Sequence, residues 1–151
     1  GAGDHPAGLH DHRARLVRVV CVAHVYRDAR LNRREYGLVV EHAESGIDSI
    51  SVVIRSDKFT KPTENRVVSR IKRELSPDSV LVARDYAILM VVGEGMAFST
   101  GMLAKATAAL AEHGINISMV NQGASEYSFM IGIKSEDRVK AVRALYQAYF
   151  G

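Results

Sequence analysis

Several stretches of the chain carry the two-residue alternation of apolar and polar positions that is typical of half-buried β-strands. The clearest runs from Tyr127 to Ile133, where large apolar residues alternate with Ser, Met and Gly. Alternation and β-branched composition together predict strands at residues 16–25, 38–40, 50–54, 79–83, 86–92, 115–121 and 127–133. A turn at 44–46 joins two of them as an antiparallel hairpin. The nearly continuous apolar run at 86–92 predicts a strand that is central or covered on both faces.

Other segments have the 3.6-residue period of a helix. In residues 61–75 apolar side chains recur at i, i+4 and i+8 from Val67, Thr63 is the predicted N-cap, and Pro77 prevents continuation. Ser135 is predicted to cap a last helix, with Glu136 and Asp137 in its first turn favouring the helix dipole. The residues predicted to mark the buried side of this helix are Val139, Val142, Tyr146 and Tyr149.

The order of these elements repeats a βα pattern twice, which predicts an α+β fold of two ferredoxin-like βαββαβ units, with antiparallel sheets and helices on one face. We predict a flexible tail at 1–15, a first unit at 16–84 and a second at 85–151. Residues 16–36 are a degenerate part of the first unit, and 26–36 form either a short exposed helix or a basic loop. The second unit lacks a closing strand. Its sheet must end open, pair with the first unit or pair with another chain, so a homodimer is expected.

The chain is organised around residues 91–126, a strand end, a glycine-bearing loop, a helix and a second strand. Gly93, Gly95 and Gly101 allow tight turns, Ser99 or Thr100 can cap the helix, and Gly114 can close it in the left-handed conformation. Free N–H groups at the helix start suit a small anion such as an amino-acid carboxylate. The alternative is that these are ordinary turn glycines. The spacing does not fit G-x-G-x-x-G, and no Gly-Lys-Ser/Thr follows, which disfavours a nucleotide site.

Composition and charge exclude several classes of protein. Of 151 residues 47% are hydrophobic, enough for a core, yet no apolar run approaches a membrane span and the N-terminus has no signal-like region. A single cysteine, Cys21, excludes an internal disulfide framework and fits a cytoplasmic protein. The net charge of +3 resides in residues 1–36, so a nucleic-acid role would have to lie there.

No catalytic constellation stands out. There is no Ser-His-Asp order or paired-carboxylate motif, and Glu94 and Glu126 flank loops without a base partner. Cys21 and His24 are two potential metal ligands without partners, and the tail histidines follow no zinc pattern. We therefore predict no catalytic residue, no metal and no cofactor.

Three stretches of the second unit resemble the second ACT domain of aspartate kinase regulatory regions: VVGEGM (91–96), TGMLAKATAALAEHGINISMVNQGASE (100–126) and SFMIGIKSEDRVKAVRALYQAYF (128–150). GLVVEHAESGIDSISVV (37–53) is similar to part of the first ACT domain. The resemblance implies a regulatory region that binds a small amino acid, usually lysine or threonine, and causes feedback inhibition of a kinase domain. The family's N-terminal Lys-Gly-Gly kinase signature is absent, which implies a regulatory fragment or subunit rather than an enzyme.

Carried over by position, the resemblance implies an effector pocket formed by the loop from Met96 to Gly101 and the strand start at 116–118. Gln122 lies where the family often places a polar contact, and Glu41 or Asp48 could pair with a ligand ammonium group. The predicted effector-binding residues are Glu41, Ser45, Asp48, Met96, Ser99, Thr100, Gly101, Asn116, Ile117 and Gln122. This chain has Thr100-Gly101 where members commonly have Pro-Gly, and residues 16–36 show no glycine loop or amphipathic helix.

Two other functions fit a ferredoxin-like fold. One is an RNA-binding module, which the fold can form with exposed aromatic residues on its sheet. No K/R-G-F-like aromatic strand appears, and the excess basic charge lies outside the repeat. The other is a dimerisation module without ligand sensing.

Overall fold

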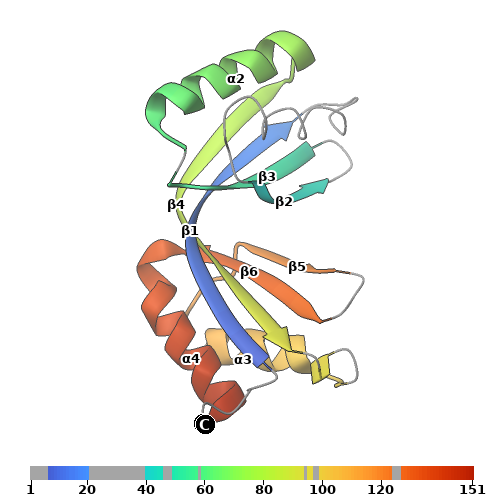
Figure 1. Ribbon diagram of the computed structural model, residues 1–151, viewed down its shortest axis with the longest axis vertical. Helices are drawn as coiled ribbons and strands as arrows, with labels where there is room; N and C mark the ends of the chain where they lie inside the picture. Colours follow the sequence, from blue (N-terminus) through green and yellow to red (C-terminus); the bar gives the residue numbers. More distant parts are fainter. Residues whose placement is uncertain are drawn as a thin grey trace, which may run out of the picture. The chain divides into compact units, whose positions relative to one another are not determined.

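The computed structural model describes residues 7–20, 40–45, 49–57, 59–93, 95–96, 99–123 and 127–151 (Figure 1). The chain divides into two compact units. We call Gly1–His12 together with Tyr86–Gly151 the terminal unit, and Arg13–Asp85 the inserted unit. The predicted boundaries at 15/16 and 84/85 therefore differ from the observed division, chiefly because the start of the chain groups with its end. The stretch 26–36, predicted as helix or loop, lies outside the described residues.

The inserted unit contains parts of two long strands, β1 (Ala7–Val20) and β4 (Ser79–Gly93), and a hairpin of β2 (Val40–Ser45) and β3 (Ser49–Arg55). Its strand order is β2-β3-β1-β4. β3 is antiparallel both to β2 and to β1, whose partners run from Ala14↔Arg55 to Val20↔Ser49. The predicted hairpin is confirmed, because alternation and a short polar turn specify its pairing locally.

Helix α2 (Lys61–Leu75) has the predicted bounds and packs its apolar stripe on the inserted unit. Val67 lies with Ile54 and Phe59 in a small buried cluster, against which Ile71 packs. The predicted N-cap is wrong by one turn. Thr60, in extended conformation, is the N-cap, because Lys61 and Pro62 already have helical geometry and proline is well tolerated there. The Thr63 hydroxyl instead shares a hydrogen bond of 3.1 Å with the Thr60 hydroxyl.

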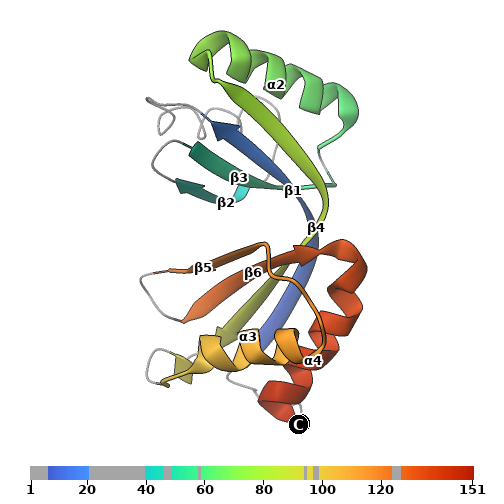
Figure 2. The same ribbon diagram turned by 180° about the vertical axis from the view of Figure 1, so that it is seen from behind.

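The terminal unit contains α3 (Met102–Glu112), β5 (Met119–Gln122), β6 (Ser128–Lys134), a 3₁₀ turn η3 (Ser135–Asp137) and α4 (Arg138–Phe150). Its strand order is β1-β4-β6-β5, and β6 is antiparallel to both β4 and β5. Both helices cover the same face of these strands (Figures 1 and 2). The core joins alternate strand residues to one stripe of each helix, with Leu89, Phe129, Ile131, Ile133, Leu110 and Leu145 among its members. The predicted α+β fold with antiparallel sheets and helices on one face is confirmed.

The closing strand that the sequence pattern does not indicate comes from the start of the chain. β1 lies beside β4, and its residues up to His12 belong to the terminal unit. Residues 7–15, predicted as a flexible tail, are therefore strand. Each unit has the strand order of a ferredoxin-like pattern. Along the chain, the inserted unit lies between the closing strand of the terminal unit and the remaining elements of that unit. A missing strand is thus no longer a reason to expect a dimer.

β4 is one strand, although two separate strands at 79–83 and 86–92 are predicted. The link, Arg84-Asp85, continues the strand even though Asp85 has a positive φ of 62°. Asp85 is also the last residue of the inserted unit. Charged residues interrupt the apolar pattern here, and only pairing with neighbouring strands keeps the backbone extended on either side.

The strained Asp85 leads to a prediction about stability. Left-handed backbone costs about 1–2 kcal/mol for a residue with a Cβ, and a β-branched side chain suffers most. We expect Asp85→Val to lower the free energy of unfolding by about 1–2 kcal/mol and Asp85→Gly to leave it unchanged or raise it. Chemical denaturation measures both. Equal destabilisation by valine and glycine would show that the carboxylate, not the backbone, matters at this position.

Three predictions in the terminal unit need correction. The strand predicted at 115–121 is confined to Met119–Gln122, since Ile115 to Ser118 form a connection whose Ser118 N–H bonds the Gly132 carbonyl at 2.8 Å. Ser135 begins a 3₁₀ turn, and Asp137 is the N-cap of α4. The buried side of α4 consists of Ala141, Ala144 and Leu145. Val139 and Tyr146, predicted to be buried, are 56% and 60% exposed, because the small alanines are the face that approaches the sheet. Val142 and Tyr149 pack partly against the core, as predicted.

Candidate functional site

The loop between β4 and α3 is held by bonds within itself. Ser99 N–H donates to the Met96 carbonyl at 3.1 Å, and Ser99 Oγ donates to the Gly95 carbonyl at 2.8 Å. The prediction that Ser99 or Thr100 caps α3 is therefore wrong, because the Ser99 hydroxyl bonds the loop and the N-cap of α3 is Gly101. The loop is anchored underneath by Met96, which is buried in the terminal-unit core.

Within the part of the chain that the structure describes, helix α3 starts without a side-chain cap. Its N-cap is Gly101, whose φ of 82° is left-handed. That turn contains no acidic residue either. Thr100 and Gly101 are exposed. The helix thus presents uncompensated N–H groups and the positive end of its dipole beside an exposed loop, a place where an anion is stabilised. At the other end Gly114, with φ 65°, ends the helix as predicted.

The second predicted segment of the site follows α3. Ile117 packs partly against the core cluster that contains Met96, while Asn116 is exposed. Gln122 is the last residue of β5 and is also exposed. The loop and this connection therefore share one core, with polar residues outside it, but they lie at opposite ends of α3.

In the inserted unit two of the three predicted residues lie on β2. Glu41 and Ser45 belong to that strand, at the edge of the β2-β3-β1-β4 order. Asp48 lies outside the described residues.

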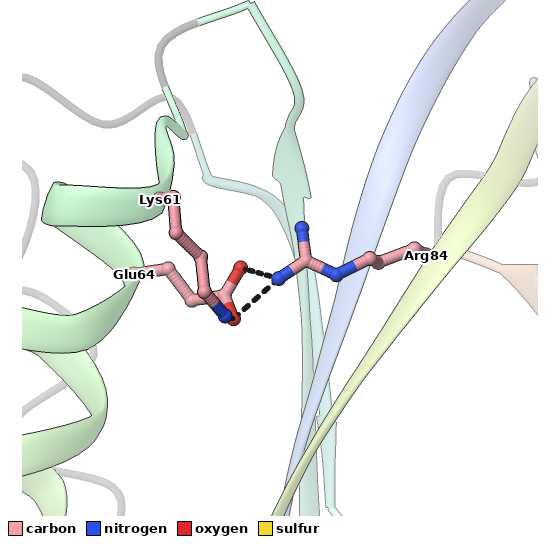
Figure 3. Close-up of polar contacts among 3 residues, drawn as sticks. All are labelled: Lys61, Glu64 and Arg84. Carbon is pink, nitrogen blue, oxygen red and sulfur yellow. Dashed lines mark hydrogen bonds and ion pairs between the residues drawn. The ribbon is translucent and has the colours of Figure 1, made fainter.

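An ion cluster that the sequence reasoning missed lies at the start of α2 (Figure 3). The Glu64 carboxylate is 6% exposed and accepts hydrogen bonds from Lys61 Nζ at 3.0 Å and from Arg84 Nη2, the latter to both carboxylate oxygens. Arg84 comes from β4, 20 positions away, and directly precedes Asp85. An acid in a first helical turn is an ordinary dipole partner, and nothing local in the sequence indicates that a strand arginine pairs with it.

Burial of the Glu64 carboxyl would raise its pKa, but the hydrogen bond from Lys61 and the positive charges of Arg84 and Lys61 outweigh burial, and the pKa is lowered from 4.5. A lowered folded-state pKa means that the ion cluster stabilises the fold above pH 4.5 and that this stability is lost as the pH falls through the folded value. The cluster fastens β4 to α2.

We therefore expect Glu64→Gln to lower the free energy of unfolding by about 1–3 kcal/mol at pH 7, the usual worth of hydrogen bonds to charged groups. The difference between the variant and the wild type should shrink below pH 4.5, as the wild-type carboxylate becomes protonated. Urea denaturation at pH 7, 5 and 3 measures it. Glu74→Gln, at a more exposed carboxylate paired with Arg70 on the same helix, is the matched control. A difference that is constant across the three pH values would contradict the ion cluster.

A hollow of about 320 Å³ lies along α2, and the described residues lining it are Asn65, Arg66, Ser69, Arg70 and Arg73. Arg70 Nε is 2.7 Å from the Glu74 carboxylate, and Arg73 Nη2 is 3.8 Å from it. One acid thus offsets part of the charge, which fits a solvated helix face better than an RNA site.

Within the described parts of the chain, no three His, Cys, Asp or Glu side chains gather as metal ligands. No helix in those parts is both long and apolar enough to cross a membrane.

Comparison with known proteins identifies the class. Residues 89–149 match the family model of the ACT domain, so this part of the chain is an ACT domain. Its residues include α3, β5, β6 and most of α4, and hence the uncapped helix start.

The relatives place the chain more closely. Aspartokinase 3 of Bacillus subtilis is 45% identical over 116 residues, which are 77% of this chain and 26% of that protein. The solved structure of Clostridium acetobutylicum aspartate kinase has 30% identity and a TM-score of 0.86, over 94% of this chain and 34% of that one. The regulatory subunit of aspartate kinase from Thermus thermophilus shares the fold, with a TM-score of 0.79 at 19% identity over 94% and 97% of the two chains. In sequence and fold, the chain resembles the ACT-domain regulatory region of aspartate kinases. It spans about a quarter of the Bacillus relative and a third of the Clostridium relative.

Proposed function

We propose that the chain senses a free amino acid, lysine or threonine, and conveys feedback inhibition to the kinase domain of an aspartate kinase, without catalysing a reaction itself. The observation that carries the proposal is the uncapped start of α3 beside an exposed loop, within a segment that is an ACT domain. The mechanism is a population shift, in which the ligand favours one arrangement of the regulatory region and the kinase domain responds to it.

The chemistry of the loop suits the common part of every amino acid. The N–H groups of the first turn of α3 and the helix dipole favour the carboxylate. Thr100 and Gly101 border this place, and Met96 supports it from the core. Asn116 and Gln122 are exposed amides that can bond the polar end of a ligand, and Ile117 gives apolar contact. We propose that Glu41 or Asp48, with Ser45, binds the ammonium group in the inserted unit's own site.

The test is thermal unfolding with free amino acids at millimolar concentration: lysine, threonine and methionine. A ligand at about 100 times its dissociation constant adds roughly 2.7 kcal/mol to the free energy of unfolding. We expect a raised midpoint for lysine or threonine only. L-lysinamide and L-threoninamide, which lack the carboxylate, are the controls and should give a much smaller shift. A chain that no amino acid stabilises would be a dimerisation module, contrary to the proposal.

We also propose a homodimer, because the strand orders leave β2 and β5 as edge strands that a second copy can cover. Light scattering behind size exclusion measures the mass in solution, with and without lysine. A monomer at both conditions would contradict it. The cytoplasmic location stays a prediction.

A further inference from the structure

The last turn of α4 is tied to the first turn of α3. Tyr149 Oη donates a hydrogen bond to the carbonyl oxygen of Met102 at 2.5 Å, across 47 positions of sequence. Met102 is the first residue of α3 and follows Gly101 directly. Both Tyr149 and Met102 pack partly against the terminal-unit core, and Lys105 Nζ lies 5.5 Å from the centre of the Tyr149 ring. The Tyr149 side chain therefore contacts two residues at the start of α3: Met102 through its hydroxyl and Lys105 through its ring.

The contact between Tyr149 and Met102 lies at a helix start that has no local capping interaction among the described residues. Most helices fix their first turn with a capping side chain or an acidic residue, and α3 has neither. The left-handed Gly101 adds backbone freedom at the same point. The hydroxyl of Tyr149 and the cation of Lys105 over its ring supply the missing restraint from a neighbouring helix.

The hydroxyl stays a donor under all ordinary conditions. Burial raises the pKa of Tyr149 to about 12, and a hydrogen bond from the backbone of Ala106 opposes this only in part. Tyr146 lies one turn earlier on α4. It is 60% exposed, and its ring packs on Phe150 with centroids 5.0 Å apart.

We propose that Tyr149 is a positioning residue for effector binding: its hydrogen bond to Met102 holds the first turn of α3 so that the N–H groups of that turn converge on a ligand carboxylate. The inference rests on the proposed function and adds to it a residue that the resemblance does not assign to the site. Tyr149 does not touch the ligand. It acts through the helix start.

The experiment compares Tyr149→Phe with Tyr146→Phe, which removes the same hydroxyl from the same helix at an exposed position. Calorimetric titration gives the affinity of each protein for L-lysine, L-threonine and their amides. We expect Tyr149→Phe to weaken the binding of whichever amino acid the wild type binds by about 3- to 10-fold, the worth of one hydrogen bond. Binding of the corresponding amide should change much less, because only the carboxylate uses the N–H groups of the turn. Tyr146→Phe should behave as the wild type.

Hydrogen exchange of the ligand-free proteins gives a second readout. Tyr149→Phe should speed exchange at the amides of residues 103–106 more than elsewhere in α3, and Tyr146→Phe should not. Equal weakening of the amino acid and its amide would mean a merely structural role and would overturn the inference. Unchanged affinity in Tyr149→Phe would also overturn it while leaving the proposed function intact. A wild type that binds neither amino acid would overturn the proposed function, and this inference with it.

Discussion

Replacing Phe129 with alanine lowers the free energy of unfolding by about 3–5 kcal/mol, the usual cost of removing a buried aromatic side chain. Phe129 is 1% exposed, and its strand β6 pairs with β4 on one side and β5 on the other. Its ring lies in the cluster that also contains Leu110 of α3 and Leu145 of α4, so the resulting cavity touches every layer of the terminal unit. Urea denaturation followed by circular dichroism measures the change.

Tyr127→Ala is the control for this prediction. Tyr127 precedes β6 by one residue and is 48% exposed, so its truncation should cost less than about 1 kcal/mol. Its backbone carbonyl, which accepts from Gly93 N–H at 2.9 Å, is unaffected by the substitution. If the two variants lose equal stability, the packing described for the terminal-unit core is wrong.

The parts of the fold that follow from local pattern are predictable from the sequence. The limits of α2 follow from an apolar stripe starting at Val67 and the stop at Pro77, and those of β6 from a strict alternation. The β2-β3 hairpin follows from two strands around a short turn. In each case the residues that specify the element are within a few positions of one another.

The parts of the fold that depend on distant partners cannot be predicted from the sequence. Residues 7–12, AGLHDH, have no strand pattern, and they form a strand because their backbone pairs beside β4. The continuity of β4 through Asp85 has the same cause. The predicted face of α4 is wrong because large apolar side chains do not mark its buried side: the close approach to the sheet is made by Ala141 and Ala144.

The candidate site shows the same division. The glycine loop and the left-handed Gly101 can be read from the sequence as a turn before a helix. The hydrogen-bond partner of Ser99 cannot be predicted from the sequence, because a hydroxyl can bond either the helix N–H groups or the loop carbonyls. In the structure it bonds the Gly95 carbonyl. The restraint from Tyr149 comes from 47 positions away and needs the packing of α4 on α3. Family resemblance points to a candidate segment for the site, and the fold identifies which contacts hold that segment.

Deleting residues 1–12 should destabilise the terminal unit by roughly 3 kcal/mol or more, at about 0.5–1.5 kcal/mol for each backbone hydrogen bond lost. The deletion removes the part of β1 that lies beside β4 in that unit and leaves β4 as an open edge. Hydrogen exchange at residues 86–92 measures the effect where it is expected. The pairing of β1 with β3, which starts at Ala14, remains, so protection in β3 should persist.

A deletion of residues 1–6 is the matched control, because it shortens the same end of the chain and keeps the whole of β1. It should leave exchange in β4 unchanged. The two deletions distinguish between two arrangements of the chain. In the first, one domain is inserted into another, and in the second, a tail precedes two consecutive domains. In the second arrangement removal of 1–12 would be as harmless as removal of 1–6.

The comparison matters for the proposed site as well, because α3 begins a few residues after β4 ends, and a loosened β4 would displace the loop that carries Gly95 and Gly101. Loss of lysine or threonine binding in the longer deletion alone would connect the closing strand to effector sensing.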